Sequence, residues 1–191
     1  MSGHGFHVHG PHDHEVEHAA QHEPKGMAGK LAVLTAILAT IGASFSYMGG
    51  ATQANAGLYK NEAAIKKTEA ANQWAFYQAK SSKQNLAELA VELVGDDKKT
   101  RYREEIERYK SEKAEIKIKA EKLEAESSDW NHQSDEQIHL HHRWAQATTV
   151  LQVSIAMAAI ALLTKNRWMT GVTLALGTVG VVLGALAWLH I

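Results

Sequence analysis

The sequence predicts an all-α membrane protein with three transmembrane helices and a long antiparallel helical (coiled-coil) hairpin between the first and second. Three long segments are apolar and almost free of charge. The region between the first two is densely charged: 16 of the 20 basic and 17 of the 21 acidic residues lie between Ala51 and Arg143. Both prolines, Pro11 and Pro24, precede all of these segments, so the rest of the chain is free to form continuous helix.

Residues 1–26 are predicted to form a disordered, histidine-rich tail. The tail is not led by Lys or Arg and shows no small-residue cleavage site, so it does not resemble a signal peptide. We therefore expect the first apolar segment to remain as a membrane anchor.

The three predicted transmembrane helices span residues 27–50, 144–164 and 168–191, with a short basic loop at 165–167. Crossing a bilayer takes ~20 apolar residues. Trp144, Trp168 and Trp188 stand at span ends, as expected of rings that prefer the membrane interface. The alternative, buried helices of a large soluble core, requires a partner core that this chain lacks.

Basic flanks predict the orientation. Lys25 and Lys30 precede the uncharged part of the first span, which begins at Leu31, and Lys165 and Arg167 lie between the second and third spans. Positive flanks favour the cytoplasm. We therefore expect a multi-pass protein of the bacterial inner (cell) membrane, with a cytoplasmic N-terminus and with the 51–143 hairpin and the C-terminus in the periplasm.

The spans contain small residues and, apart from Lys30 at the start of the first, no Asp, Glu, Lys or Arg. Gly177, Gly180 and Gly184 in the third span, which include a GxxxG, predict close helix packing. A transport pathway usually contains an ionisable residue. The polar candidates for lining a pore are Gln146, Thr149 and Gln152.

The charged segment 51–143 divides into two arms of nearly equal length around a turn near 94–98. A heptad seam in the second arm predicts packing between helices or copies; it comprises Tyr102, Ile106, Tyr109, Lys113, Ile116, Ala120, Leu123, Ser127 and Trp130. In the first arm, one apolar face carries Leu86, Leu89, Ala90 and Leu93. An alternative is a helix break at Ser127-Ser128-Asp129. A two-helix stalk has a narrow core, so we expect self-association to bury the remaining apolar side chains.

Aromatic residues in both arms are predicted to face the opposite arm as core packing: Trp74, Phe76, Tyr77, Tyr102 and Tyr109. The Lys and Arg residues of the insert alternate with acids, which is typical of a solvated helix face and does not favour nucleic-acid binding.

The segment Asn72-Gln-Trp-Ala-Phe-Tyr-Gln-Ala-Lys-Ser-Ser-Lys-Gln84, together with the order of the other segments, resembles an uncharacterised bacterial membrane-protein family, domain of unknown function 4337. The resemblance covers nearly the whole chain. It implies the three-span topology and no catalytic residues.

Seven tail histidines are candidates for binding Zn(II), Ni(II) or Cu(II); they are His4, His7, His9, His12, His14, His18 and His22. His14, His18 and His22 would share a face in a helix. The alternative is a polar tail that gains charge at low pH. The match of His14–His18 to HExxH lacks the folded domain and third ligand of a zinc protease, so we expect no enzyme.

A second histidine group lies at the end of the second arm. His132, Glu136 and His139 are spaced to share a helical face, with His141 and His142 following. In an oligomer they could form a ring that binds metal or senses pH; the alternative is a solvated cluster at the membrane surface.

Three hypotheses follow. The first is a self-assembling structural or scaffold protein that is anchored in the lipid bilayer. Its projecting stalk would contact copies of itself and a periplasmic protein partner. The second is a channel or transport accessory with its pore between protomers. The third is a metal or pH sensor.

Overall fold

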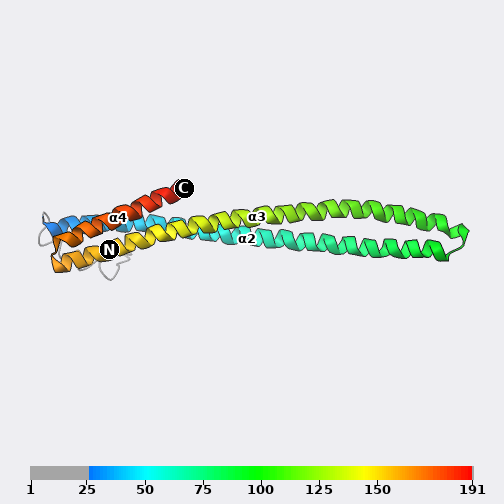
Figure 1. Ribbon diagram of the computed structural model, residues 1–191, viewed down its shortest axis with the longest axis horizontal. Coiled ribbons are helices and arrows are strands. Elements are labelled where there is room, and N and C mark those ends of the chain that lie inside the picture. Colours follow the sequence, from blue (N-terminus) through cyan, green and yellow to red (C-terminus); the bar gives the residue numbers. More distant parts are fainter. Residues whose placement is uncertain (1–25, 191) are drawn as a thin grey trace, which may run out of the picture. The chain divides into compact units, whose positions relative to one another are not determined.

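The computed structural model describes residues 26–190, and this part of the chain consists of three helices without a strand (Figure 1). Helix α2 spans Met27–Leu93, α3 spans Asp96–Thr164 and α4 spans Arg167–Trp188. Each contains a stretch long and apolar enough to cross a membrane. The prediction of an all-helical protein with three long apolar helices is therefore confirmed.

The chain folds as two compact units. The apolar unit contains the residues up to Gln53 and those from Ile138 onward, and the charged unit is Ala54–Gln137. Helix α2 runs without interruption through Gly49 and Gly50, where the sequence predicts the end of the first apolar helix. Helices α2 and α3 thus contribute one segment each to both units.

Two short connections separate the helices. Val94 and Gly95 join α2 to α3, and Asp96 and Asp97 in the first turn of α3 interact favourably with its positive dipole end. Lys165 and Asn166 join α3 to α4. Lys165 adopts a left-handed conformation with φ of 50°, and the Asn166 side chain accepts a hydrogen bond from the backbone N–H of Trp168.

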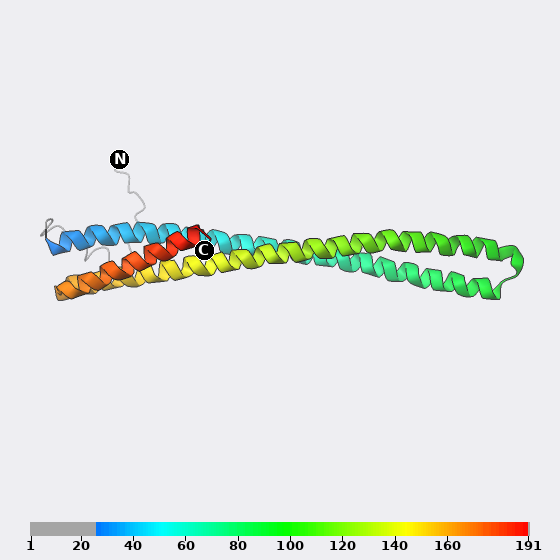
Figure 2. The ribbon, with the colours of Figure 1, turned by 45° about the horizontal axis from the view of Figure 1, so that its top comes forward.

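In the charged unit, the α2 and α3 segments lie side by side in opposite directions (Figures 1 and 2). Small residues at steps of seven occupy the contact; they are Ala56, Ala63 and Ala70 on α2, and Ala120, Ser127 and Ser134 on α3, all buried. Small side chains allow two helix backbones to approach closely. The predicted break at Ser127 does not occur, because α3 continues through it.

The heptad seam of the second arm is placed as the sequence predicts, since all nine of its members are buried or half-buried. The apolar face of the first arm lies away from α3. Leu86, Leu89 and Leu93 do share a face of α2, but all three are more than half exposed, whereas Ala87 is buried. The prediction that Phe76 faces the opposite arm is wrong, because its side chain is 58% exposed. An alanine fits the narrow space between the helices, and a leucine or phenylalanine does not.

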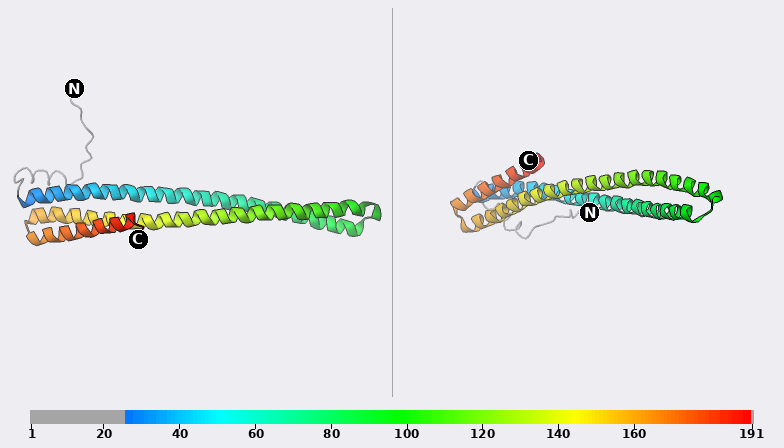
Figure 3. Two further views of the ribbon diagram at one scale, coloured as in Figure 1. Left: turned by 90° about the horizontal axis from the view of Figure 1, so that it is seen from above. Right: turned by 45° about the vertical axis from the view of Figure 1, so that its right-hand side comes forward.

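In the apolar unit, α4 lies alongside the first part of α2 and the last part of α3 (Figure 3). One core cluster is formed by Leu31, Ala158 and Ala161. The Ser154 hydroxyl is fully buried and donates a 2.7 Å hydrogen bond to the carbonyl oxygen of Thr173 on α4. This bond joins α3 to α4. It also gives the Ser154 hydroxyl a partner that its apolar surroundings would otherwise not supply.

Candidate functional site

The predicted metal-binding residues fall into three parts of the chain. His14, His18 and His22 lie outside the described residues, so the metal hypothesis for the tail stays a prediction. In the charged unit, His132 Nε2 lies 3.5 Å from Glu136 Oε1, and both side chains are largely exposed. Within residues 26–190, no group of three or more His, Cys, Asp or Glu side chains is arranged to hold a metal ion. His139 and His142 lie in the apolar unit, and the metal hypothesis for this histidine group stays a prediction.

His141 has a structural role that the sequence does not reveal. Its Nδ1 lies 2.8 Å from the carbonyl oxygen of Gly49 on α2, within the apolar unit. A carbonyl oxygen only accepts, so Nδ1 carries the proton in this bond. A Cβ at Gly49 would lie 3.4 Å from Cβ of Trp144, an ordinary van der Waals distance, so this contact does not require a glycine. His141 thus joins α3 to α2 through its Nδ1.

Two serines join the helices of the charged unit in the same manner. The hydroxyl of Ser127 donates to the carbonyl oxygen of Ala63 at 2.8 Å, and that of Ser134 donates to Ala56 at 2.9 Å. The two serines are seven residues apart on α3, and the residues that accept their hydrogen bonds are seven residues apart on α2, in the reverse order. They fix the register of the antiparallel pair, because a shift of one residue would leave buried hydroxyls without partners.

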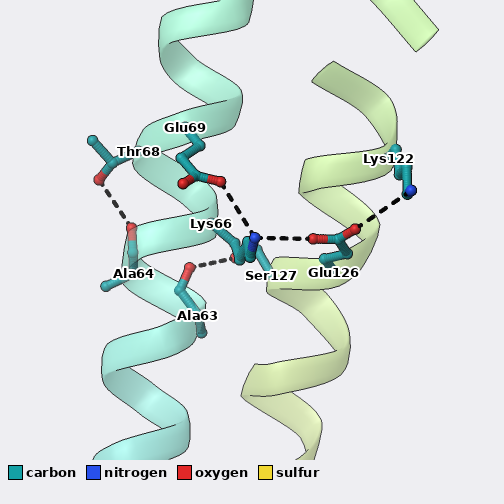
Figure 4. Close-up of polar contacts among 8 residues, drawn as sticks. All are labelled: Ala63, Ala64, Lys66, Thr68, Glu69, Lys122, Glu126 and Ser127. Carbon is teal, nitrogen blue, oxygen red and sulfur yellow. Dashed lines mark hydrogen bonds and ion pairs between the residues drawn. The ribbon is translucent and has the colours of Figure 1, made fainter. Parts of the chain in front are cut away.

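Ion pairs flank this contact. Lys66 lies 3.3 Å from Glu126 on α3 and 3.4 Å from Glu69 on its own helix (Figure 4). The hydrogen bond to Glu126, followed by that to Glu69, raises the pKa of Lys66. Further along the pair, the hydrogen bond and ion pair with Lys80 lower the pKa of Glu112. These pairs are exposed enough that we assign them a role in register rather than in stability.

The aromatic prediction holds for part of the set. Lys113 Nζ lies 5.1 Å from the ring centroid of Tyr77, and Lys80 Nζ lies 5.5 Å from that of Tyr109. Trp74 packs edge-on against Tyr77. These contacts lie between or along the two arms and serve as core packing.

The exposed face of α2 in the charged unit carries a row of large apolar side chains, which we call the outer stripe. It consists of Leu58, Ile65, Phe76, Leu86, Leu89 and Leu93. Leu58, Ile65, Leu86 and Leu93 are separated by multiples of seven residues, so they share one helix face. That spacing was the available sequence signal. The apolar face predicted for the first arm included only residues near the turn and left out Leu58 and Ile65.

Charge is unequally divided between the exposed faces of the two arms. Helix α2 has no charged residue from Ala70 to Ala79. The exposed positions of α3 carry charges such as Arg103, Glu107 and Lys122. The single large apolar side chain exposed on α3 in the charged unit is Ile118. The outer stripe is therefore an apolar surface without a partner in the described chain, whereas α3 presents a solvated face.

The predicted packing residues are used within the chain. Ile106 is buried and Ile116 and Leu123 are half-buried in the charged unit. Gly177, Gly180 and Gly184 are all buried on α4. A Cβ at Gly180 would lie 2.7 Å from Leu151 Cδ2 on α3, and one at Gly184 would overlap the ring of Phe45 on α2. The GxxxG thus holds α4 against the other two helices of the same chain.

The three candidate pore residues lie on one exposed side of α3 in the apolar unit. Gln146, Thr149 and Gln152 follow each other at intervals of three residues. Thr149 donates to the carbonyl oxygen of Ala145 within the helix. A shallow groove of about 390 Å³ includes Gln146 and Thr149. The three side chains form a polar line on the 144–164 segment of α3, whose other exposed residues are mostly apolar.

The described residues form three helices that are each long and apolar enough to cross a membrane, which fits a membrane protein of unknown activity. Residues 27–190 match the family described as Domain of unknown function (DUF4337), and the chain belongs to this family. The resemblance predicted from residues 72–84 is thereby confirmed. No curated protein and no solved structure matches the chain.

Proposed function

We propose that this protein is a self-assembling structural or scaffold protein of the bacterial inner membrane, without enzymatic activity. The three apolar helices anchor it in the bilayer. The charged unit forms a coiled-coil stalk in the periplasm, where it contacts other copies and a periplasmic protein partner. The basic residues Lys30, Lys165 and Arg167 support this orientation because positive flanks favour the cytoplasmic side.

The outer stripe of α2 is the observation that carries the proposal. Six large apolar side chains on one helix face are costly to leave in water, at about 25 cal/mol per Å² of apolar surface. A second copy is the occupant that best fits the stripe. Chains anchored in one membrane with one orientation stand parallel, so identical stripes meet at equal distances from the bilayer.

The charges around the stripe support the same arrangement. Apart from Lys83, the residues between Ala70 and Gln84 that face away from α3 are uncharged, including Asn72, Gln78 and Ser82. Between Ala70 and Gln84, two copies can therefore meet along α2 with Lys83 as the one position that places like charges opposite one another. A pairing through the exposed face of α3 would bring many identical charges together.

Replacing Leu86 and Leu89 by glutamine is expected to weaken self-association by at least about tenfold. Glutamine keeps a good helix propensity but removes two large apolar side chains from the stripe. The distribution of oligomers would be measured by native mass spectrometry in mild detergent. It would also be measured in spheroplasts with a membrane-impermeant, amine-reactive crosslinker, which reaches the lysines of a periplasmic stalk.

Ile118→Gln on α3 is the matched control, since Ile118 is also exposed but lies outside the stripe. It should leave the oligomers unchanged. Monomers alone from the unmodified protein, in detergent and in membranes, would refute self-assembly. A stalk that the impermeant reagent cannot reach in spheroplasts would refute the periplasmic orientation.

The polar line of α3 favours a second candidate, a channel or transport accessory with its pore between protomers. Gln146, Thr149 and Gln152 would face lipid in a single chain, where an unpaired amide is unfavourable. Association of copies along this side of α3 would bring the three side chains together around a water-filled path.

Replacement of Gln146 and Gln152 by leucine is expected to abolish solute or ion flux into liposomes if the pore exists. The matched change is Val153→Leu, an exposed apolar position of the same helix. Flux through the unmodified protein no greater than through protein-free liposomes would exclude this candidate.

A further inference from the structure

A groove in the apolar unit combines two cations with an apolar floor. It has a volume of about 400 Å³ and lies where α2 and α4 begin. Lys30 of α2 and Arg167 of α4 line it, together with Met27, Leu31, Leu34 and Thr170. Lys30 and Arg167 are 137 positions apart in the sequence, and only the packing of α4 against α2 brings them to one groove.

Among the residues of this unit that the structure describes, no carboxylate neutralises the two cations. The described residues of the apolar unit, 26–53 and 138–190, contain neither Asp nor Glu. The positive end of the α4 dipole lies at Arg167, the first residue of the helix, and adds to the same field. The positive field of the groove therefore favours an anion.

The walls of the groove indicate what kind of anion fits. Met27 and Leu34 pack against the core cluster around Leu31, so the floor is apolar and continuous with the membrane-facing surface. A soluble anion gains nothing from such a floor. A phospholipid places its phosphate between the cations and its acyl chains along the apolar side chains.

We propose that this groove is a binding site for an anionic phospholipid of the cytoplasmic leaflet. Arg167 offers a planar fork of donors suited to phosphate, and Lys30 contributes a second positive charge. The inference depends on the membrane insertion and orientation in the proposed function but not on self-assembly. The bound lipid would hold the starts of α2 and α4 together at the membrane surface.

The test uses the full chain, delipidated in mild detergent and offered equal amounts of phosphatidylglycerol and phosphatidylcholine with the same acyl chains. Native mass spectrometry counts the lipids retained. The unmodified protein should retain phosphatidylglycerol in preference to phosphatidylcholine. Lys30→Gln and Arg167→Gln should each reduce this preference several-fold, and the double variant should reduce it by about tenfold or more.

Lys165→Gln is the matched control, because Lys165 is a basic residue of the adjoining loop that does not line the groove. It should keep the preference for phosphatidylglycerol. An equal loss in Lys165→Gln would mean that diffuse charge attracts the lipid and would overturn the site, as would equal retention of both lipids by the unmodified protein. Displacement of the lipid by millimolar inorganic phosphate would show a soluble-anion site and would overturn the lipid assignment.

Insertion itself is checked separately by resistance of the membrane-bound protein to carbonate extraction. A protein that resists extraction but shows no lipid preference refutes the groove alone. A protein that is extracted refutes the membrane insertion on which both proposals depend.

Discussion

Replacement of Gly184 by leucine is expected to lower the free energy of unfolding by about 1–3 kcal/mol, the usual range for over-packing a filled site. Even a Cβ at this position would overlap the ring of Phe45. That ring cannot move aside freely, because its centroid lies 5.3 Å from that of Trp144, which is itself buried. Trp144 in turn meets Trp188 edge-on. We therefore expect α4 to be pushed away from α2.

The measurement is unfolding of the full chain in mixed detergent, followed by circular dichroism. Gly171→Leu is the matched control, since a Cβ at Gly171 has no neighbour within 4 Å and the residue lies on the same helix. It should change the unfolding free energy by no more than about 0.5 kcal/mol. Equal losses for Gly171→Leu and Gly184→Leu would contradict the described packing of α4.

Replacement of Ala120 by leucine is expected to destabilise the charged unit by about 1–3 kcal/mol. Ala120 and Ala70 are both fully buried, at 0% exposure, at the close contact between α3 and α2. A leucine there must force the helices apart. The separation would stretch the neighbouring hydrogen bond from Ser127 to Ala63, which leaves a buried hydroxyl unpaired.

Thermal unfolding of the full chain, followed by circular dichroism, measures this effect. Ala125→Leu provides the control, because Ala125 is exposed on the same helix and leucine has a similar helix propensity. Its unfolding temperature should stay close to that of the unmodified protein. A lower temperature for Ala125→Leu than for Ala120→Leu would mean that the arms do not meet along the alanine and serine positions.

These two predictions bear on function because they separate contacts within a chain from contacts between chains. The glycines of α4 and the alanines of the charged unit are occupied inside one chain. The outer stripe and the polar line of α3 remain exposed, so they are the surfaces on which self-assembly or a pore must depend. Variants of the buried glycines and alanines should lower the free energy of unfolding. Variants of the outer stripe should alter the oligomers, and variants of the polar line should alter flux.

Much of the fold follows from composition and periodicity. Long uncharged segments predict helices long enough to cross a membrane, since the length of such a segment reflects the thickness of hydrocarbon. The turn at Gly95 was predictable because glycine and two aspartates interrupt a helical pattern. The inward side of the second arm was predictable because its large residues repeat at heptad spacing.

Other features depend on which residues the pairing brings together. The first arm has two apolar patterns, one of alanines and one of leucines, and periodicity alone does not say which faces α3. The small residues face α3 because the serines opposite them donate to α2 carbonyl oxygens, and this requires close backbones. The leucines are then left outside, and so is Phe76, which was expected from the sequence to face the opposite arm.

The sequence by itself determined that this protein is helical, that three of its segments suit a bilayer and that charge is confined mainly to one region. Each of these depends on local properties of the chain, namely hydrophobicity, helix propensity and the positions of Pro and Gly. Only the tertiary structure decided which face of α2 stays exposed, where the GxxxG packs and that Lys30 and Arg167 line one groove. These depend on the register and proximity of helices distant in sequence, and such contacts are set by the fit of whole surfaces.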